Sequence, residues 1–214
     1  DTQLQLPGVC GTRDECPDEV MLQGLDARIA QLPAAQRAHG VVVFLHQMGS
    51  HGPDYFKRSP PRLKRFEPEC RSNALQQCPA AEVVNAYDNT IVTTDDFLAS
   101  AIAWLQRHED GWAPALSYVS DHGESLGERN LYLHGLPYAI APDEQKHVPW
   151  LFWLSPQFQR QSGITLACLQ AQRDRPLSHD NYFHTTLGLL GVATSTYDAA
   201  RDIGAGCAAA PAAR

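Results

Sequence analysis

The chain has 214 residues, of which 43% are hydrophobic and 19% are charged, and its formal net charge is −7. This size and composition are typical of a globular protein that buries a substantial core. The acidic balance argues against a nucleic-acid partner, because domains that bind nucleic acid normally carry a positive excess that replaces counterions along the phosphate backbone.

Targeting signals are not evident in the sequence. The longest apolar runs, residues 40–45 and 149–154, are far too short to cross a bilayer. The first residues also lack the basic-then-apolar pattern of a signal peptide. We therefore expect any export signal or membrane anchor to lie outside this chain.

The spacing of apolar residues predicts helices and strands that alternate along the chain. Residues 19–32 have helical spacing, and after a breaker at Gly40 the apolar run 41–46 predicts a strand that ends in His46. A long helix is predicted over residues 79–108, with one buried stripe. That stripe is formed by Val84, Tyr87, Ile91, Leu98, Ile102 and Leu105.

Two more strands and a helix complete the predicted elements. Residues 116–120 and 150–154 predict strands, and a helix is predicted to follow Ser178, its N-cap, and to continue through Leu190. This alternation predicts an α/β fold, layered α/β/α around a mostly parallel central sheet. With no internal repeat, a single domain over residues 1–214 is the simpler interpretation.

Six cysteines, an even number, predict disulfides. Cys10 is close to Cys16 and Cys70 is close to Cys78 in the sequence, which leaves Cys168 to pair with Cys207. Three disulfides would indicate an oxidising compartment. The alternative, six buried thiols in a cytosolic protein, remains open from the sequence alone.

A carboxylate and two histidines follow the strand predicted over residues 116–120. Asp121 and His122 are adjacent, Gly123 permits a turn directly after them, and His134 follows. Because a strand points successive side chains to opposite faces, Asp121 and His122 converge only where the strand has ended. Such N and O donors suit a divalent metal such as zinc.

A second histidine pair follows the strand predicted over residues 41–46. His46 and His51 flank the flexible Gly49-Ser50 in a loop. In open α/β sheets ligands gather beyond the carboxyl ends of strands, so this loop and the Asp121-His122 segment are expected to meet there. Taken together, these five side chains predict a divalent metal site.

Other charged residues have simpler interpretations. The basic run 57–65 could face lipid headgroups or phosphate groups, or be a solvated loop. Glu124 and Glu128 could serve as a metal ligand or base, but acids are also favoured in the first turn of a helix, and we prefer that interpretation.

Four segments in this order carry a resemblance to a known family: HQMGSHGP, NAYDNTIVTTDDF, YVSDHGESLGE and YLHGLPYAIAP. They resemble the periplasmic catalytic domain of the phosphoethanolamine–lipid A transferases, which include the transferable colistin-resistance enzymes. That group belongs to the alkaline phosphatase and sulfatase superfamily. The resemblance covers essentially the whole chain, which would form the C-terminal two thirds of the family's soluble domain.

The resemblance implies roles for the five side chains. Asp121 and His122 would bind the catalytic zinc, and His51 and His134 would hold a second zinc or the substrate phosphate. His46 would line the same pocket and contact the phosphoryl group. One or two zinc ions are therefore expected.

The resemblance also implies an activity and a location. Phosphoethanolamine would move from phosphatidylethanolamine to a threonine, and then to a phosphate of lipid A, at the periplasmic face of the bacterial inner membrane. The family's threonine nucleophile, a glutamate zinc ligand and the membrane anchor come from sequence upstream of the part matched here. A lysine that the family has before Gly8 is Pro7 in this chain.

Two other functions remain open. A sulfatase, phosphodiesterase or phosphoglycerol transferase of the same superfamily would keep the fold and the metal but use another acceptor. A metal-binding fragment without catalytic activity would bind zinc and turn over no phospholipid. Neither Ser50 nor Ser125 stands on the strand-to-helix turn that would expose a nucleophile.

Overall fold

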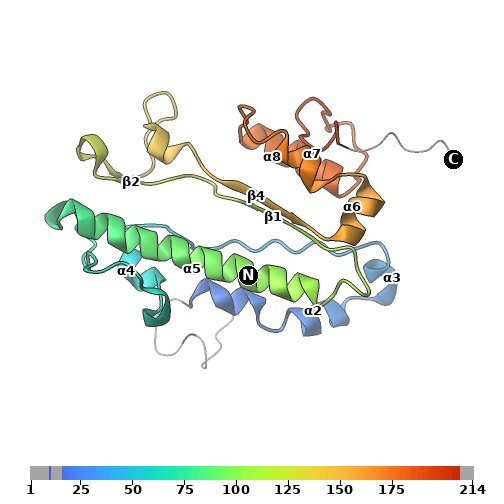
Figure 1. Cartoon of the computed structure of the whole chain (residues 1–214), viewed down its shortest axis with the longest axis horizontal. Coiled ribbons are helices and arrows are strands. Elements are labelled where there is room, and N and C mark those ends of the chain that lie inside the picture. Colours follow the sequence, from blue (N-terminus) through green and yellow to red (C-terminus); the bar gives the residue numbers. More distant parts are fainter. Residues whose placement is uncertain (1–9, 11–15, 208–214) are drawn as a thin grey trace. The chain divides into compact units, whose positions relative to one another are not determined.

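The computed structural model describes residue 10 and residues 16–207 (Figure 1). The chain divides into two compact units. Unit 1 comprises Asp1–Ala101 and Glu124–Gln145, and unit 2 comprises Ile102–Gly123 and Lys146–Arg214. Helices and strands are both present, as the predicted α/β class requires.

Unit 1 is mainly helical, and one short hairpin completes it. Its elements are η1 (Asp18–Leu22), α2 (Leu25–Gln31), α3 (Ala34–Arg37), α4 (Tyr55–Arg58), η2 (Pro61–Leu63), η3 (Leu75–Gln77), most of α5 (Ala80–Gln106), β2 (Ser125–Leu126), η4 (Glu128–Asn130), β3 (Tyr132–Leu133) and η5 (Asp143–Gln145). The helix predicted over residues 19–32 is therefore two elements. Gly24 separates them, because its φ of 71° is left-handed and cannot continue a right-handed helix.

The long helix is confirmed as α5, but its predicted buried stripe is wrong. Val84 and Ile91 are 39% and 46% exposed. The residues of α5 that are buried are Val83, Ala86, Asn89, Thr90, Thr94, Phe97 and Ala101. Three of them are polar, so the spacing of apolar residues alone does not predict which face of α5 is buried.

Hydrogen bonds explain why polar side chains of α5 are buried. The Asn89 Oδ1 accepts from the backbone N–H of Arg65 at 2.8 Å and of Phe66 at 3.0 Å. The Thr90 hydroxyl bonds Ser50 Oγ at 2.7 Å. A buried polar group that finds its partners avoids most of its desolvation cost, so these side chains fix the preceding loops against α5.

The strand predicted over residues 41–46 does not form. The segment pairs with no strand among the described residues. Most of its side chains are also exposed, to 50% at Val42 and 73% at Phe44. The apolar run satisfies the local pattern of a strand, but a strand needs a hydrogen-bonded neighbour, and none of the described segments supplies one.

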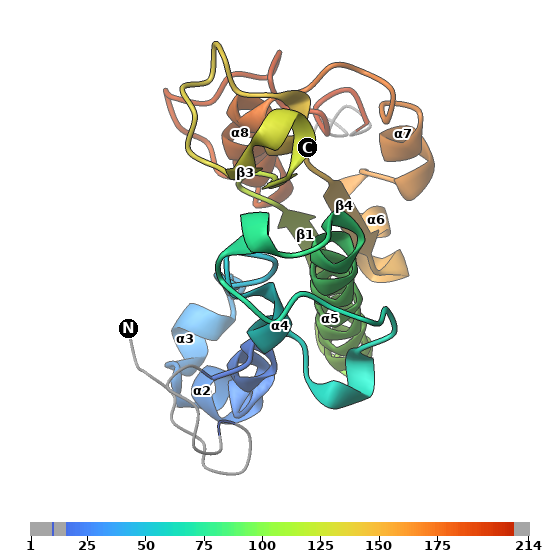
Figure 2. The same ribbon diagram turned by 90° about the vertical axis from the view of Figure 1, so that its left-hand side faces the viewer.

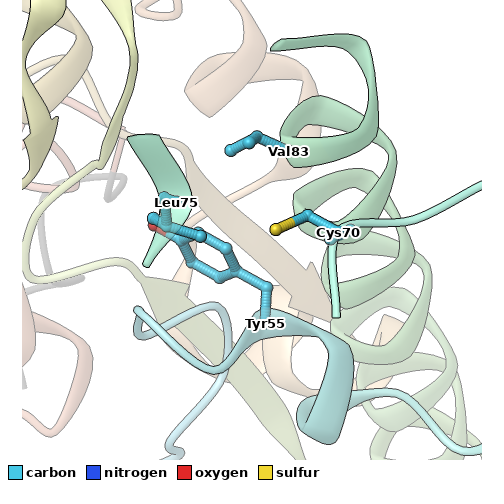
Figure 3. Close-up of a cluster of buried hydrophobic side chains, with 5 residues drawn as sticks. Tyr55, Cys70, Leu75 and Val83 are labelled. Atoms are coloured by element: carbon cyan, nitrogen blue, oxygen red, sulfur yellow. The ribbon is translucent and has the colours of Figure 1, made fainter. Parts of the chain in front are cut away.

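The core of unit 1 lies where α4, η3 and α5 meet (Figure 3). Figure 3 shows the Tyr55 ring directed toward Leu75, with Cys70 and Val83 beside it. Leu126 of β2 and Leu133 of β3 pack against the same cluster. A two-residue strand pair has little stability of its own, so this packing holds the hairpin.

Unit 2 contains the only five-residue strands among the described residues. They are β1 (Ala115–Val119) and β4 (Trp150–Leu154), which confirm two predicted strands within about one residue. Figures 1 and 2 show them side by side, and they pair antiparallel, with Ser117 opposite Phe152. The prediction that strands within this chain pair in parallel is wrong, because an apolar run does not encode the direction of its partner.

Three helices complete unit 2: α6 (Pro156–Ser162), α7 (Leu166–Gln170) and α8 (His179–Leu189). The predicted N-cap of α8 is confirmed, since Ser178 and Asn181 form a reciprocal capping box. Leu154, Ile164 and Leu169 form a buried cluster with Ile203. Among the described residues, no helix is both long and apolar enough to span a membrane.

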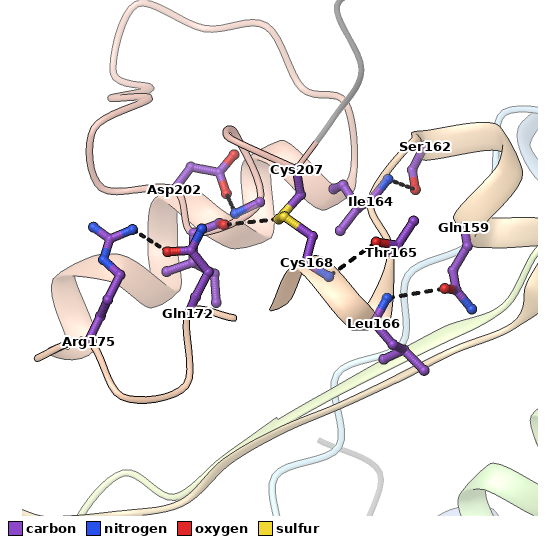
Figure 4. The surroundings of a disulfide bond; sticks show 12 residues. Gln159, Ser162, Ile164, Thr165, Leu166, Cys168, Gln172, Arg175, Asp202 and Cys207 are labelled. Carbon is purple, nitrogen blue, oxygen red and sulfur yellow. Dashed lines mark hydrogen bonds between the residues drawn. A yellow bond between two sulfur atoms is a disulfide. The ribbon is translucent and has the colours of Figure 1, made fainter. Parts of the chain in front are cut away.

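All three predicted disulfides are present: Cys10–Cys16, Cys70–Cys78 and Cys168–Cys207. Figure 4 shows the third bridge, beside Thr165. The Thr165 hydroxyl accepts from the Cys168 N–H at 3.2 Å and caps α7. This bridge ties α7 to the end of the described chain.

Truncation of a buried apolar residue of unit 1 should reduce stability far more than truncation of an exposed one. Leu75 is 2% exposed, so Leu75→Ala should lower the free energy of unfolding by about 2–5 kcal/mol. Phe44→Ala should change it by less than about 0.5 kcal/mol, because that ring is 73% exposed. Urea unfolding of both variants measures the difference, and a large loss in Phe44→Ala would mean that residues 41–46 are covered.

The disulfides predict that the unreduced chain contains no reactive thiol. Unfolded in denaturant without reductant, it should not react with a thiol reagent, and reduction should expose all six cysteines. Reaction of two or more thiols before reduction would contradict the pairing.

Candidate metal centre

The β2–β3 hairpin of unit 1 places an acid opposite a histidine. Ser125 pairs with Leu133 in the antiparallel register. Glu124 directly precedes β2 and His134 directly follows β3, so the two residues continue the same register. The His134 Nδ1 and Glu124 Oε1 atoms lie 3.1 Å apart. Leu133 has a left-handed φ of 64°, a strained conformation for a leucine, just before His134.

The loop that carries His51 is fixed to this hairpin. The Gly52 N–H donates to the same Glu124 oxygen at 3.2 Å. A Cβ at Gly52 would lie 2.5 Å from Leu133 Cδ2 and 2.8 Å from the Tyr55 hydroxyl, so any other residue would force these buried side chains to move. The approach of the two segments brings the rings of His51 and His134 to 5.0 Å, and their potential ligand nitrogens lie within 4.8 Å of each other.

The hydrogen bonds of these histidines define their tautomers. The His51 Nδ1 atom lies 2.7 Å from the Gly52 carbonyl, which can only accept, so Nδ1 carries the proton. The Glu124 Oε1 atom, which also accepts from the Gly52 N–H, likewise faces the Nδ1–H of His134. In both rings the lone pair of the neutral imidazole is therefore on Nε2, as a metal ligand requires.

Asp121 and His122 lie in unit 2, just after β1. The chain has left the strand at Val119, which allows two adjacent side chains to point the same way. The Asp121 Oδ2 and His122 Nε2 atoms are 3.7 Å apart. His122 Nδ1 lies 3.0 Å from the Gly123 carbonyl, so its lone pair is also on Nε2.

Both pairs fit a zinc ion by their donor chemistry. Ligands at about 2.0–2.2 Å from a tetrahedral zinc are roughly 3.4 Å from each other, so the Asp121–His122 separation needs only a small shift. The ligand nitrogens of His51 and His134 lie within 4.8 Å of each other, so the pair can share a metal ion after a shift of one ring. Each pair offers fewer than the three protein ligands of a typical catalytic zinc site.

One predicted site residue is not brought to these pairs. His46 is exposed and lies outside the group of metal-competent histidines found among the described residues. His46 was predicted to join the site because it would end a strand. Residues 41–46 do not form a strand, so that basis for the prediction does not hold.

The prediction that Glu124 lies in the first turn of a helix is wrong. It is 6% exposed and does not lie in the first turn of a helix. Glu128 does lie at the start of η4, as its interpretation required. The only sequence signal for Glu124 is its spacing of ten residues from His134, which has meaning once the hairpin between them is known.

The basic run 57–65 is largely paired with acids. Lys57 bonds Asp54 at 2.9 Å, and Arg62 bonds Glu19 at 2.7 Å. Lys64 forms an ion pair with the buried Glu69. Lys57 and Arg62 remain 61% and 53% exposed, as a solvated loop requires.

Comparisons with known proteins place the chain in a family. The family model described as Sulfatase matches residues 2–192. The chain belongs to the sulfatase family. It is 49% identical over 203 residues to the phosphoethanolamine transferase EptA of Salmonella typhimurium, a match that covers 94% of this chain and 36% of the relative.

Two further relatives have similar names. The chain is 44% identical over 186 residues to the phosphatidylethanolamine transferase Mcr-1 of Escherichia coli, covering 86% of this chain and 32% of the relative. The solved soluble domain of lipooligosaccharide phosphoethanolamine transferase A from Neisseria meningitidis superimposes with a TM-score of 0.88 at 39% identity. That match covers 97% of this chain and 60% of that domain, and it confirms the predicted sulfatase-like α/β fold.

Because the ligand atoms are imidazole nitrogens, zinc affinity is predicted to decrease as the pH falls. Because protons and zinc compete for Nε2 of these imidazoles, affinity should fall at least tenfold between about pH 7.5 and about pH 5.5. Competition with a chromophoric chelator measures this affinity. His51→Ala and His134→Ala should weaken the pH dependence, whereas affinity that does not change over this range would exclude these histidines as ligands.

Proposed function

We propose that this chain is the metal-binding part of a transferase that moves phosphoethanolamine from a membrane phospholipid to a phosphate of lipid A. The observation that carries the proposal is the 49% identity with a phosphoethanolamine transferase over 94% of the chain. The chain spans about a third of that relative's length, so the activity belongs to a longer polypeptide. The names of Mcr-1 and of the Neisseria protein supply the donor phosphatidylethanolamine and a lipooligosaccharide acceptor.

In this proposal Asp121 and His122 hold the catalytic zinc together with ligands from outside the chain. A bound zinc ion would lower the pKa of a hydroxyl nucleophile and offset negative charge on the phosphoryl oxygens. His51 and His134 would hold a second zinc through the Nε2 lone pair or, when the ring is protonated, donate Nε2–H to the phosphoryl group. His46 is assigned to the phosphoryl group by the family resemblance alone.

The transfer runs in two displacements. A threonine oxygen attacks phosphorus, the bond from phosphorus to the glycerol oxygen breaks, and diacylglycerol leaves with the proton. An oxygen of a lipid A phosphate then attacks the same phosphorus, the bond from phosphorus to the threonine oxygen breaks, and that oxygen regains a proton. A protonated histidine beside the phosphoryl group can donate to the leaving oxygen in either step.

The structure favours a nucleophile from outside this chain. Ser125 is fully buried and its hydroxyl accepts from Gln145 at 2.9 Å. The Ser50 hydroxyl accepts a hydrogen bond from the buried Thr90 hydroxyl. Both hydroxyls are therefore engaged in packing, and neither is presented for attack on a lipid.

The compartment follows from the cysteines. Three disulfides persist in an oxidising environment, which in a bacterium is the periplasm. A catalytic domain held at the periplasmic face of the inner membrane by an anchor elsewhere in the polypeptide would meet both lipid substrates. Modified lipid A carries less negative charge, so the activity would confer resistance to polymyxins such as colistin.

A chimera tests the proposal. This chain replaces the matching segment of the Salmonella transferase, and the lipid A of a strain without other transferases is examined by mass spectrometry. One phosphoethanolamine group should be added, and Asp121→Ala or His122→Ala should reduce the product at least a hundredfold. Glu144→Ala, which removes an exposed acid of unit 1, should leave the product unchanged.

The same experiment separates the alternatives. Diacylglycerol release with free phosphoethanolamine and unmodified lipid A would indicate a hydrolase. Zinc binding without any product would indicate a metal-binding module.

A second experiment uses the 214-residue chain alone, which should turn over no fluorescent phosphatidylethanolamine. Zinc-dependent turnover that Asp121→Ala abolishes would show that the chain carries its own nucleophile.

A further inference from the structure

We propose that Glu124 is a positioning residue: it accepts the Nδ1–H of His134 and so presents the lone pair of Nε2 to a metal ion. What His134 binds rests on the proposed function, whereas the orientation of its ring does not.

Glu124 is an unusual residue for a buried position. Its side chain is 2% exposed, and removing a carboxylate from water is unfavourable unless donors replace the water. Oε1 accepts from Gly52 N–H and from His134, but Oε2 has no hydrogen-bond partner among the described residues. A packing role alone would be served better by an apolar or amide side chain.

Tyr55 faces the same carboxylate. It is 1% exposed, and its hydroxyl also has no partner of acceptable hydrogen-bond geometry in the described part of the chain. Burial, together with the neighbouring Glu124 carboxylate, raises the pKa of the Tyr55 hydroxyl above its usual value, so the hydroxyl remains protonated. Glu124 and Tyr55 are therefore neighbouring buried side chains that each carry one polar atom without a hydrogen-bond partner among the described residues.

The hairpin limits how far His134 can turn. Glu124 and His134 flank paired strands, and the Glu124 oxygen that meets the imidazole is also tied to Gly52. The acceptor therefore has a fixed position in relation to the ring. Without it, the neutral imidazole of His134 could place its proton on Nε2, which would remove the lone pair that a metal ion needs.

The test compares variants that keep or remove the acceptor. Glu124→Gln keeps an oxygen where Oε1 lies, whereas Glu124→Met fills the space without an acceptor, and Glu124→Ala is a second variant without one. Tyr55→Phe alters the packing around Glu124 but not the acceptor, and Glu144→Ala is the matched control for loss of an exposed acid. Each is made in the 214-residue chain.

The first readout is the tautomer of His134, measured by long-range ¹H–¹⁵N correlation in zinc-free protein at about pH 8, where imidazoles are neutral. The wild type, Glu124→Gln, Tyr55→Phe and Glu144→Ala should show protonated Nδ1, and the two variants without an acceptor should show protonated Nε2. Protonated Nε2 in the wild type, or protonated Nδ1 in Glu124→Met and Glu124→Ala, would overturn the proposal.

The second readout is zinc affinity by chelator competition. Loss of the acceptor should weaken binding about 10–100-fold, and Glu124→Gln should be intermediate. Wild-type chain that shows the expected tautomer but binds no zinc would contradict the proposed function and support the positioning role. Unchanged zinc affinity in Glu124→Met with a changed tautomer would overturn the claim that the tautomer matters for binding.

Discussion

The hydrogen bond from the Gly52 N–H to Glu124 is the constraint on which the site in unit 1 depends. It joins residues 72 positions apart, and its acceptor also meets His134. The close approach is favoured because residue 52 has no side chain, since a Cβ there would overlap Leu133 and Tyr55 unless they moved. One small residue therefore allows a loop and a hairpin to approach closely enough for two histidines to face each other.

The sequence was a good guide where the pattern is local. Ser178 was identified as an N-cap because capping depends on residues within one turn, and the Cys pairings followed from short separations and elimination. Asp121 and His122 were placed correctly after a strand, since β1 ends at Val119. These features need no knowledge of what lies across the fold.

Features that depend on distant partners were not predictable. The 41–46 run reads as a strand, yet strand formation requires pairing that the run itself does not contain. Asn89 and Thr90 are buried because loops at residues 50 and 65–66 reach them, so apolar periodicity placed the buried stripe of α5 one position off. Glu124 was misassigned for the same reason, as its partners lie 72 and 10 residues away.

Site and core in unit 1 are coupled in both directions. The hairpin that carries Glu124 and His134 has strands of only two residues, so it depends on the cluster around Tyr55 and Leu75 for its position. Leu133 holds a strained backbone within that hairpin, which the surrounding packing must offset. A ligand that binds only the folded arrangement returns stability to it, by about 2.7 kcal/mol at a free concentration of one hundred times its Kd. Occupation of the His51–His134 pair would therefore stabilise the hairpin and the core beneath it, and damage to the core would loosen the pair before unit 1 unfolds.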